Sequence, residues 1–174
     1  MDSAVWDYFT SHRPGWLVDI AKVLAFVGDD TVLLPVTFLV ALVALARGRR
    51  SLTAVAPFLA MLTTTVAVGL AKVLIGRERP PLAGQLVETA SASMPSGHSA
   101  YAAALATVAW FTVAGHVPAR AVRGAVICAA AAAGAARLVL GVHWLSDVLA
   151  GWVVGAAAGA GVVVLLRGRL QSSG

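Results

Sequence analysis

Apolar residues occur along this chain in long runs that short polar stretches separate. The runs lie at about residues 16–28, 31–46, 52–75, 97–115, 121–137 and 142–166. A helix needs about 20 mainly apolar residues to cross a bilayer core of roughly 30 Å. The pattern therefore predicts an all-α, polytopic membrane protein, a bundle of about six transmembrane helices.

The first run gives the weakest of these predictions. Asp19 and Lys22 interrupt residues 16–28, and the run is shorter than the spanning length. We expect a tilted span here, and the alternative is an amphipathic helix that lies in the membrane interface. Because Asp2 and Asp7 precede the run, we expect it to remain as an anchor and not to act as a removable signal peptide.

Composition supports a membrane protein and excludes several classes. Of the 174 residues, 59% are hydrophobic and 12% are charged, whereas an average soluble domain has roughly 25% charged residues. We expect one domain over residues 1–174, with an N-terminal helix in 1–30 and a helical bundle over 31–166. The single cysteine, Cys128, allows neither an internal disulfide nor a cysteine-based metal site.

The net charge of +5 comes mainly from cations at the ends of the runs, which is typical of membrane orientation and not of a nucleic-acid surface. The clusters are Arg47, Arg49 and Arg50, then Arg120 and Arg123, then Arg167 and Arg169. Six spans place all of them on one side, and the positive-inside rule makes that side and the C-terminus cytoplasmic. The connections near 28–30, 76–96 and 138–142 then lie on the extracytoplasmic face.

The long connection 76–96 departs from this rule. Lys72, Arg77 and Arg79 lie in it or just before it, on the side where few cations are expected. Charged groups in a membrane are costly and usually functional. We therefore expect an anion to bind at this end of the bundle.

Two histidines near the outer connections are candidates for chemistry. His143 and Asp147 are separated by one helical turn, so the carboxylate can accept the proton of one ring nitrogen and leave the other as a nucleophile or base. His98 opens another run on the same side, where an imidazole can act as general acid and base.

One helix start also indicates an anion site. Ser96 reads as an N-cap, and the free backbone N–H groups of the first turn after it attract phosphate. Lys72, Arg79 and Arg137 add three positive charges from three segments. The planar fork of arginine matches phosphate oxygens, and lysine supplies a mobile point charge.

Three motifs follow one another at this end of the predicted bundle. The chain reads KVLIGRERP from Lys72, PSGH from Pro95 and ARLVLGVHWLSD from Ala136. They resemble the signature of the type 2 phosphatidic acid phosphatases, the PAP2 family: Lys-x6-Arg-Pro, Pro-Ser-Gly-His and Ser-Arg-x5-His-x3-Asp. The resemblance covers about residues 31–166 and implies a PAP2/haloperoxidase-like helical core. Ala136 departs from the family, which usually has a serine there and with it one hydrogen bond near the phosphate.

The resemblance also implies a role for each motif residue. It makes His143 the group that takes the phosphoryl group, with Asp147 fixing its tautomer, while His98 protonates the leaving oxygen and later deprotonates the attacking water. The phosphate oxygens would be held by Lys72, Arg79, Arg137, Ser96 and the backbone N–H of Gly97. These groups would replace the magnesium of other phosphatases, so we expect no metal and no other cofactor.

We therefore expect an integral membrane enzyme that hydrolyses a lipid phosphomonoester or diphosphate through a phosphohistidine. A polyprenyl diphosphate such as undecaprenyl diphosphate is the expected substrate, with phosphatidylglycerol phosphate and phosphatidic acid as alternatives. A lipid transporter or scramblase would need polar residues through the depth of the bilayer, and an inactive homologue would not need these histidines and cations. The vanadium-dependent haloperoxidases resemble the site, but a soluble enzyme would not need such apolar helices.

The remaining polar residues have ordinary explanations. We expect His12 and His116 to be solvated on the cytoplasmic side, away from the site. Arg77 is expected to pair with Glu78 or with lipid headgroups, or to assist substrate binding.

Aromatic and small residues are expected to serve packing. We expect three tryptophans to lie at the membrane interface or to pack between helices: Trp16, Trp144 and Trp152. A face for close helix approach is formed by Gly151, Gly155 and Gly159, which are spaced four residues apart.

Overall fold

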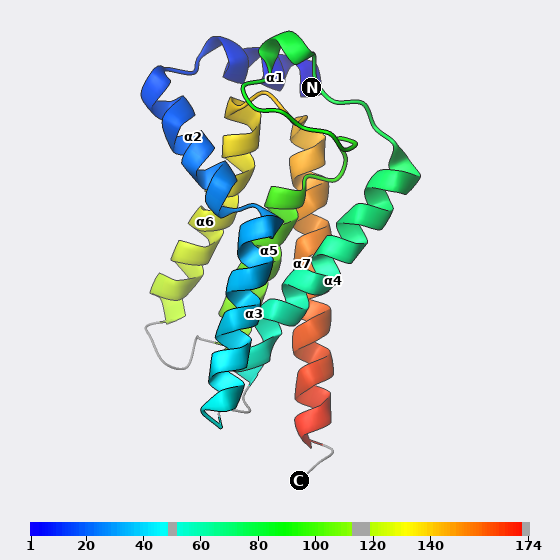
Figure 1. Cartoon of the computed structure of the whole chain (residues 1–174). Coiled ribbons are helices and arrows are strands. Elements are labelled where there is room, and N and C mark those ends of the chain that lie inside the picture. The colour runs from blue at the N-terminus through cyan, green and yellow to red at the C-terminus, as the bar shows by residue number, and fades with distance from the viewer. Residues whose placement is uncertain (49–51, 113–118, 172–174) are drawn as a thin grey trace.

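The computed structural model describes residues 1–48, 52–112 and 119–171, and within them every regular element is a helix (Figure 1). In chain order they are α1 (Asp2–Ser11), α2 (Gly15–Val27), α3 (Asp30–Ala46), α4 (Leu52–Ile75), the short 3-10 helix η1 (Leu82–Gly84), α5 (Gly97–Thr112), α6 (Ala119–Val139) and α7 (Leu145–Gln171). The all-α expectation is confirmed.

Three of these helices are long and apolar enough to cross a membrane alone: α4, α6 and α7. α2 and α3 pass the same test only as a pair, across a break where they bend by 49°. With 13 residues, α2 is about 20 Å long at 1.5 Å per residue, too short to span by itself. The expected count of about six spans is therefore approximate: the described residues hold three such helices, or four with the bent pair.

The bundle has two distinct ends (Figure 1). α1, η1 and the connection 76–96 lie at one end, which we call the outer end, and the connection 140–144 lies there too. α2 descends from this end and α3 continues downward, so the connection 28–30 lies partway along the bundle and not at the outer end as predicted. Among the described cations, the opposite end holds Arg47, Arg120, Arg123 and Arg167. Arg49, Arg50 and His116 lie outside the described residues.

α5 and α7 pack against each other along the glycines of α7. A Cβ atom on Gly155 would overlap the carbonyl oxygen of Ala100, and one on Gly159 would lie 2.7 Å from that of Ala104. A Cβ on Gly151 would similarly crowd the first turn of α5. Small residues let two membrane helices approach this closely, so the predicted packing face is present.

This close packing brings the beginnings of α5 and α7 together. The backbone N–H of Ser96, just before α5, donates to the carbonyl oxygen of Asp147 in the first turn of α7, with an N···O distance of 2.9 Å. Two of the three sequence motifs therefore meet at the outer end because the helices below them are in contact.

Glycines turn the chain at the outer ends of α4 and α6. Gly76 has φ +59° and its N–H donates to the carbonyl of Lys72, which ends α4 in the left-handed conformation that glycine adopts without strain. Gly141, with φ +72°, turns the chain between α6 and α7. These turns place Lys72 and Arg137 in the last turns of their helices, beside the outer connections.

α1 lies across the outer end and was not predicted, because its ten residues contain no apolar run. The indole N–H of Trp6 donates to the carbonyl of Gly141, and the guanidinium of Arg13 donates to the carbonyls of Gly84 and Val139. His12 ends this helix, exposed as expected but at the outer end, so its expected place away from this end was wrong.

Candidate active site

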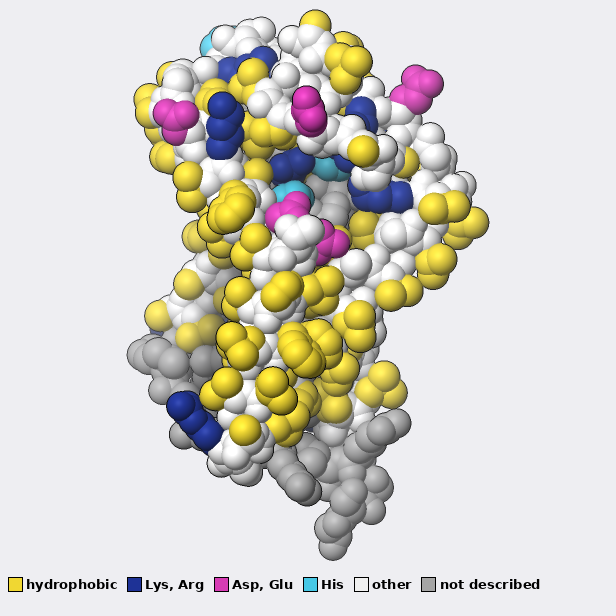
Figure 2. Space-filling model, viewed as in Figure 1, with side chains coloured by type: hydrophobic (Ala, Val, Ile, Leu, Met, Phe, Trp, Pro, Cys, Tyr) yellow, Lys and Arg dark blue, Asp and Glu magenta, His cyan; other side chains and the backbone are white. Residues whose placement is uncertain are grey.

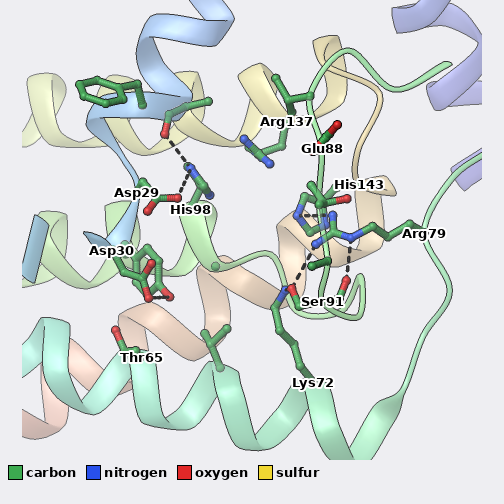
Figure 3. A pocket seen from close by; sticks show the side chains of 18 of the residues that line it. Asp29, Asp30, Thr65, Lys72, Arg79, Glu88, Ser91, His98, Arg137 and His143 are labelled. Atoms are coloured by element: carbon green, nitrogen blue, oxygen red, sulfur yellow. Dashed lines mark hydrogen bonds and ion pairs between the residues drawn. The ribbon is translucent and has the colours of Figure 1, made fainter. Parts of the chain in front are cut away.

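A cavity of about 570 Å³ opens at the outer end between α2, α4, α5, α6 and the connection before α5. Figure 2 shows a hollow there in which cationic and histidine side chains gather, with apolar side chains covering the surface below. The polar side chains that line the cavity include Lys72, Arg79, His98, Arg137 and His143, together with Asp29, Asp30 and Tyr101. Figure 3 shows the cations, histidines and aspartates among them entering the cavity from different segments.

His143 lies in the connection just before α7 and is 2% exposed. Its Nδ1 is 3.3 Å from Oδ2 of Asp147, and its Nε2 is 3.3 Å from Nη1 of Arg79. A carboxylate only accepts and a guanidinium only donates, so Nδ1 carries the proton and Nε2 carries a lone pair. Burial lowers the pKa of His143 to about 3, against the hydrogen bond to Asp147 that raises it. The imidazole is therefore neutral at neutral pH, with a lone pair on Nε2.

Asp147 is fully buried and holds His143 in place. Its Oδ2 accepts from the backbone N–H of Trp144 at 2.8 Å and from the hydroxyl of Ser93. Its Oδ1 accepts from Nη1 of Arg77 at 2.7 Å. The contact with Trp144 resembles the return bond of a capping box, in which a side chain in the first helical turn satisfies the backbone N–H at the N-cap. The fold therefore fixes this carboxylate before any substrate binds.

Two cations at the cavity wall donate to the connection before α5. Lys72 Nζ lies 2.8 Å from Ser91 Oγ and 2.7 Å from the carbonyl of Ala92, and Arg79 Nε lies 2.8 Å from the carbonyl of Ser91. Arg79 Nη1 donates to the carbonyl of Val142 at 2.7 Å. Burial lowers the pKa of Arg79, and the charge of Asp147 opposes this shift. Backbone and hydroxyl oxygens thus hold both donors at the cavity wall, with Nη1 of Arg79 beside Nε2 of His143.

Arg137 differs from the other two cations. It is 5% exposed, lines the cavity from the last turn of α6, and its Nε has no hydrogen-bond partner among the described residues. A buried polar group without a partner costs free energy, and a buried charge costs more. This arginine is therefore suited to an anion that enters the cavity.

His98 lines the cavity from the first turn of α5. Its Nε2 is 2.8 Å from the carbonyl oxygen of Ala25 and 3.7 Å from Oδ2 of Asp29. Because a carbonyl only accepts, Nε2 carries a proton in this arrangement. The end of α2 therefore fixes the orientation of the second histidine.

Of the eight residues predicted for the site, six line one cavity: Lys72, Arg79, Gly97, His98, Arg137 and His143. Asp147 lies behind His143. Ser96 precedes α5 as expected of an N-cap, but it is fully buried, and its hydroxyl accepts from Ser99 at 3.1 Å while its N–H donates to Asp147. Ser96 therefore does not line the cavity, and its N–H is bound to the start of α7.

Two side chains contact Asp147 without having been predicted to do so. Arg77 donates to Asp147 and Asp2 and forms no ion pair with Glu78, contrary to one expectation. Ser93 has no signal in the sequence, because its role depends on how the connection before α5 folds over His143. Ala136 packs in an apolar cluster that includes Ala21 of α2, which the sequence also did not indicate.

Trp144 and Trp152 both serve packing. Trp144 Nε1 donates to the carbonyl of Glu78 at 3.1 Å, and the guanidinium of Arg77 lies 5.8 Å from its ring. Trp152 Nε1 donates to the carbonyl of Ala130 in α6. Both rings therefore tie helices or connections together.

Comparison with protein families gives one match, in which the model of the PAP2 superfamily covers residues 53–170. The chain belongs to the PAP2 superfamily. No match was found among curated proteins. The match includes all three motifs and the helices that carry them.

Two solved structures have a similar fold. This PAP2 protein is similar to a transmembrane PAP2-type phosphatidylglycerolphosphate phosphatase from Bacillus subtilis, with a TM-score of 0.83 and 27% identity over 95% of this chain and 84% of that one. It also resembles LpxE of Aquifex aeolicus in fold, with a TM-score of 0.75 and 22% identity over 93% of this chain and 94% of that one. The family and these neighbours support a phosphatase that is a multi-pass membrane protein.

Proposed function

We propose that this PAP2 protein is a lipid phosphatase that forms and hydrolyses a phosphohistidine at His143. One observation carries the proposal: the lone pair on Nε2 of a neutral, buried imidazole lies at the wall of a cavity that three cations and a second histidine also line. A nucleophile fixed by a carboxylate, among donors that suit phosphate oxygens, is the arrangement that phosphoryl transfer requires.

The reaction has two steps. In the first, Nε2 of His143 attacks phosphorus, the bond to the leaving oxygen breaks, and His98, which enters this step as the imidazolium, donates a proton to that oxygen and becomes neutral. In the second, His98 takes a proton from water, the water oxygen bonds to phosphorus, and the bond to Nε2 breaks to release inorganic phosphate. Lys72, Arg79 and Arg137 neutralise the phosphoryl oxygens in both steps, and each such donor is worth about 10²- to 10³-fold in rate.

We further propose that no metal takes part. The described residues contain no group of three or more His, Cys, Asp or Glu that could hold a metal ion. Three cations from α4, the connection 76–96 and α6 supply positive charge at the cavity instead. Turnover in the presence of a chelator tests this part of the proposal.

A polyprenyl diphosphate such as undecaprenyl diphosphate is the first substrate to test. Phosphatidylglycerol phosphate is the second, because the neighbour that is 27% identical is named for that activity. We propose an extracytoplasmic site and a cytoplasmic C-terminus, which is supported by the arginines at the opposite end of the bundle. A reporter fused after the C-terminus should then be active only in the cytoplasm.

The deciding experiment measures phosphate release from a panel of lipid phosphates and diphosphates by purified protein in detergent with chelator. We expect turnover of at least one lipid, a loss of about 10³-fold or more in kcat for His143→Ala, and strong inhibition by orthovanadate, which imitates the five-coordinate transition state. His12→Ala is the matched control, because that histidine is exposed at the end of α1. Wild-type turnover by His143→Ala would disprove the proposed nucleophile.

A further inference from the structure

One arginine at the outer end belongs to none of the groups that line the cavity. Arg77 follows the turn that ends α4, and its side chain is 29% exposed. Its Nη1 donates to Oδ1 of Asp147 at 2.7 Å and to the hydroxyl of Ser146 at 2.6 Å, and its Nη2 donates to Oδ2 of Asp2 at 2.8 Å. The guanidinium also lies over the ring of Trp144. Arg77 is thus held by the start of α7 and by α1.

Asp2 of α1 contributes to the same network from the other side. Its Oδ1 accepts from the backbone N–H of Ser146 at 3.0 Å, and its Oδ2 accepts from the hydroxyl of Ser146. The first-turn N–H groups of a helix have no partner within the helix, so a carboxylate from α1 supplies one for α7. Asp2 therefore holds both Arg77 and the helix turn that carries Asp147.

The result is a line of alternating charge that ends at the nucleophile. Asp2 contacts Arg77, Arg77 contacts Oδ1 of Asp147, and Oδ2 of Asp147 contacts Nδ1 of His143. Partial burial works against charge on Asp2, but hydrogen bonds from Ser146 and Arg77 lower its pKa. Burial likewise opposes charge on Arg77, but its two carboxylate partners raise its pKa. Both groups stay ionised at neutral pH.

We propose that Arg77, held by Asp2, is a positioning residue that fixes the plane of the Asp147 carboxylate and through it the ring of His143. The inference rests on the proposed phosphohistidine reaction. Arg77 does not line the cavity, so it does not bind the phosphoryl group in the ground state. Arg77 acts while Nε2 of His143 forms its bond to phosphorus. At that point the hydrogen bond from Nδ1–H to Asp147 must keep the imidazole ring oriented toward the phosphorus atom.

A positioning role predicts a specific kinetic pattern for Arg77→Gln. We expect kcat to fall about 10- to 100-fold, with KM and the Ki of inorganic phosphate unchanged, because the cations of the cavity remain. The affinity for orthovanadate, whose five-coordinate form bonds to Nε2, should fall about tenfold or more, in parallel with kcat. Arg77→Lys keeps a charge but no fork, and its kcat should lie between those of Arg77→Gln and the wild type.

Asp2→Asn tests the contribution of α1. We expect a smaller fall in kcat, about three- to tenfold. In the double variant with Arg77→Gln, kcat should be no lower than for Arg77→Gln alone, because the two residues act through one contact. Independent, multiplying losses would overturn the role given to Asp2.

The matched control is Arg13→Gln. Arg13 also ties the N-terminal segment to the outer connections, through the carbonyls of Gly84 and Val139, but it touches no carboxylate of the site. We expect Arg13→Gln to lower Tm while kcat stays at the wild-type value. An equal loss of kcat in Arg13→Gln and Arg77→Gln would overturn the proposal, since general loosening of α1 would then explain both.

The failure of this inference can be told from failure of the proposed function. Wild-type kcat in Arg77→Gln beside an inactive His143→Ala would overturn the positioning role alone. If the wild type hydrolyses no lipid phosphate, the proposed function fails, and calorimetric titration with orthovanadate still decides the role of Arg77. Equal vanadate affinity of wild type and Arg77→Gln would then overturn it, and a weaker affinity of the variant would support it.

Discussion

The outer end and the middle of the bundle differ in what they bury. At the outer end a neutral histidine, a carboxylate and an arginine are buried together beside a cavity, and the Nε of that arginine has no partner in the part of the chain that the structure describes. In the middle, α5 and α7 touch through glycine and alanine, with backbone against backbone. The contact between α5 and α7 is packed backbone against backbone, whereas the outer end keeps polar groups around a cavity.

This difference indicates where stability and activity are located. Buried groups with incomplete partners reduce stability and are retained where they serve a function. Close contact between small residues contributes to helix association in a membrane and has no chemistry of its own. Substitutions at the two places should therefore separate the two properties.

The largest difference between the effect on activity and the effect on stability is expected for Arg137→Gln. Because Arg137 lines the cavity and its Nε has no partner among the described residues, kcat/KM should fall about 10²- to 10³-fold. Tm should not fall, because the change removes a buried charge that lacks full compensation. Lipid phosphate hydrolysis and thermal unfolding of the same preparation check both parts. A loss of activity that comes with a large fall in Tm would contradict this separation.

Gly155→Ala should give the opposite result. The added Cβ overlaps the carbonyl oxygen of Ala100, so α5 and α7 must move apart at a cost of about 1–3 kcal/mol. We expect a clear fall in Tm, with the kcat of the folded fraction much less affected than in Arg137→Gln. Gly161→Ala on the same helix is the matched control, because nothing lies within 4 Å of its added Cβ. Equal Tm values for the two variants would show that the contact is not tight.

The smallest effect is a dependence of stability on pH at the outer end. The pKa of His143 is about 3 in the folded protein, whereas an unfolded chain has the ordinary histidine pKa of 6.5. Between these values the unfolded chain binds a proton that the folded protein does not. The contribution of the neutral His143 to the free energy of unfolding is therefore fully present above pH 6.5 and is lost as the pH falls toward 3.

His143→Asn removes this contribution. We expect Tm to fall more for the wild type than for His143→Asn when the pH is lowered from about 7.5 to about 5. Parallel curves for the two proteins would contradict a neutral, buried His143.

The sequence predicted which residues come together at the outer end, because short motifs on helices fix their positions. Lys72, Arg137 and His98 lie at helix ends, and apolar runs in a membrane determine where helices end. The resemblance to a known family supplied the order in which the motifs meet. Six of the eight predicted residues line one cavity for this reason.

What the sequence did not predict depends on contacts between distant segments. Asp2 lies 144 residues before Ser146, and no periodicity connects a ten-residue polar helix with the start of α7. Ser93 reaches Asp147 only because a long connection folds over His143. The bend between α2 and α3 was missed because two adjacent apolar runs read as two spans, whereas α2 is too short for one.

The position of Asp2 has a practical consequence for anyone who produces this protein. An affinity tag fused before Met1 would start one residue away from the carboxylate that caps α7, and its bulk would compete with that contact. α7 carries the chain to the opposite end of the bundle, so a tag fused there leaves the cap untouched. If a preparation with an N-terminal tag has weak activity, its kcat should be compared with that of a preparation with a C-terminal tag.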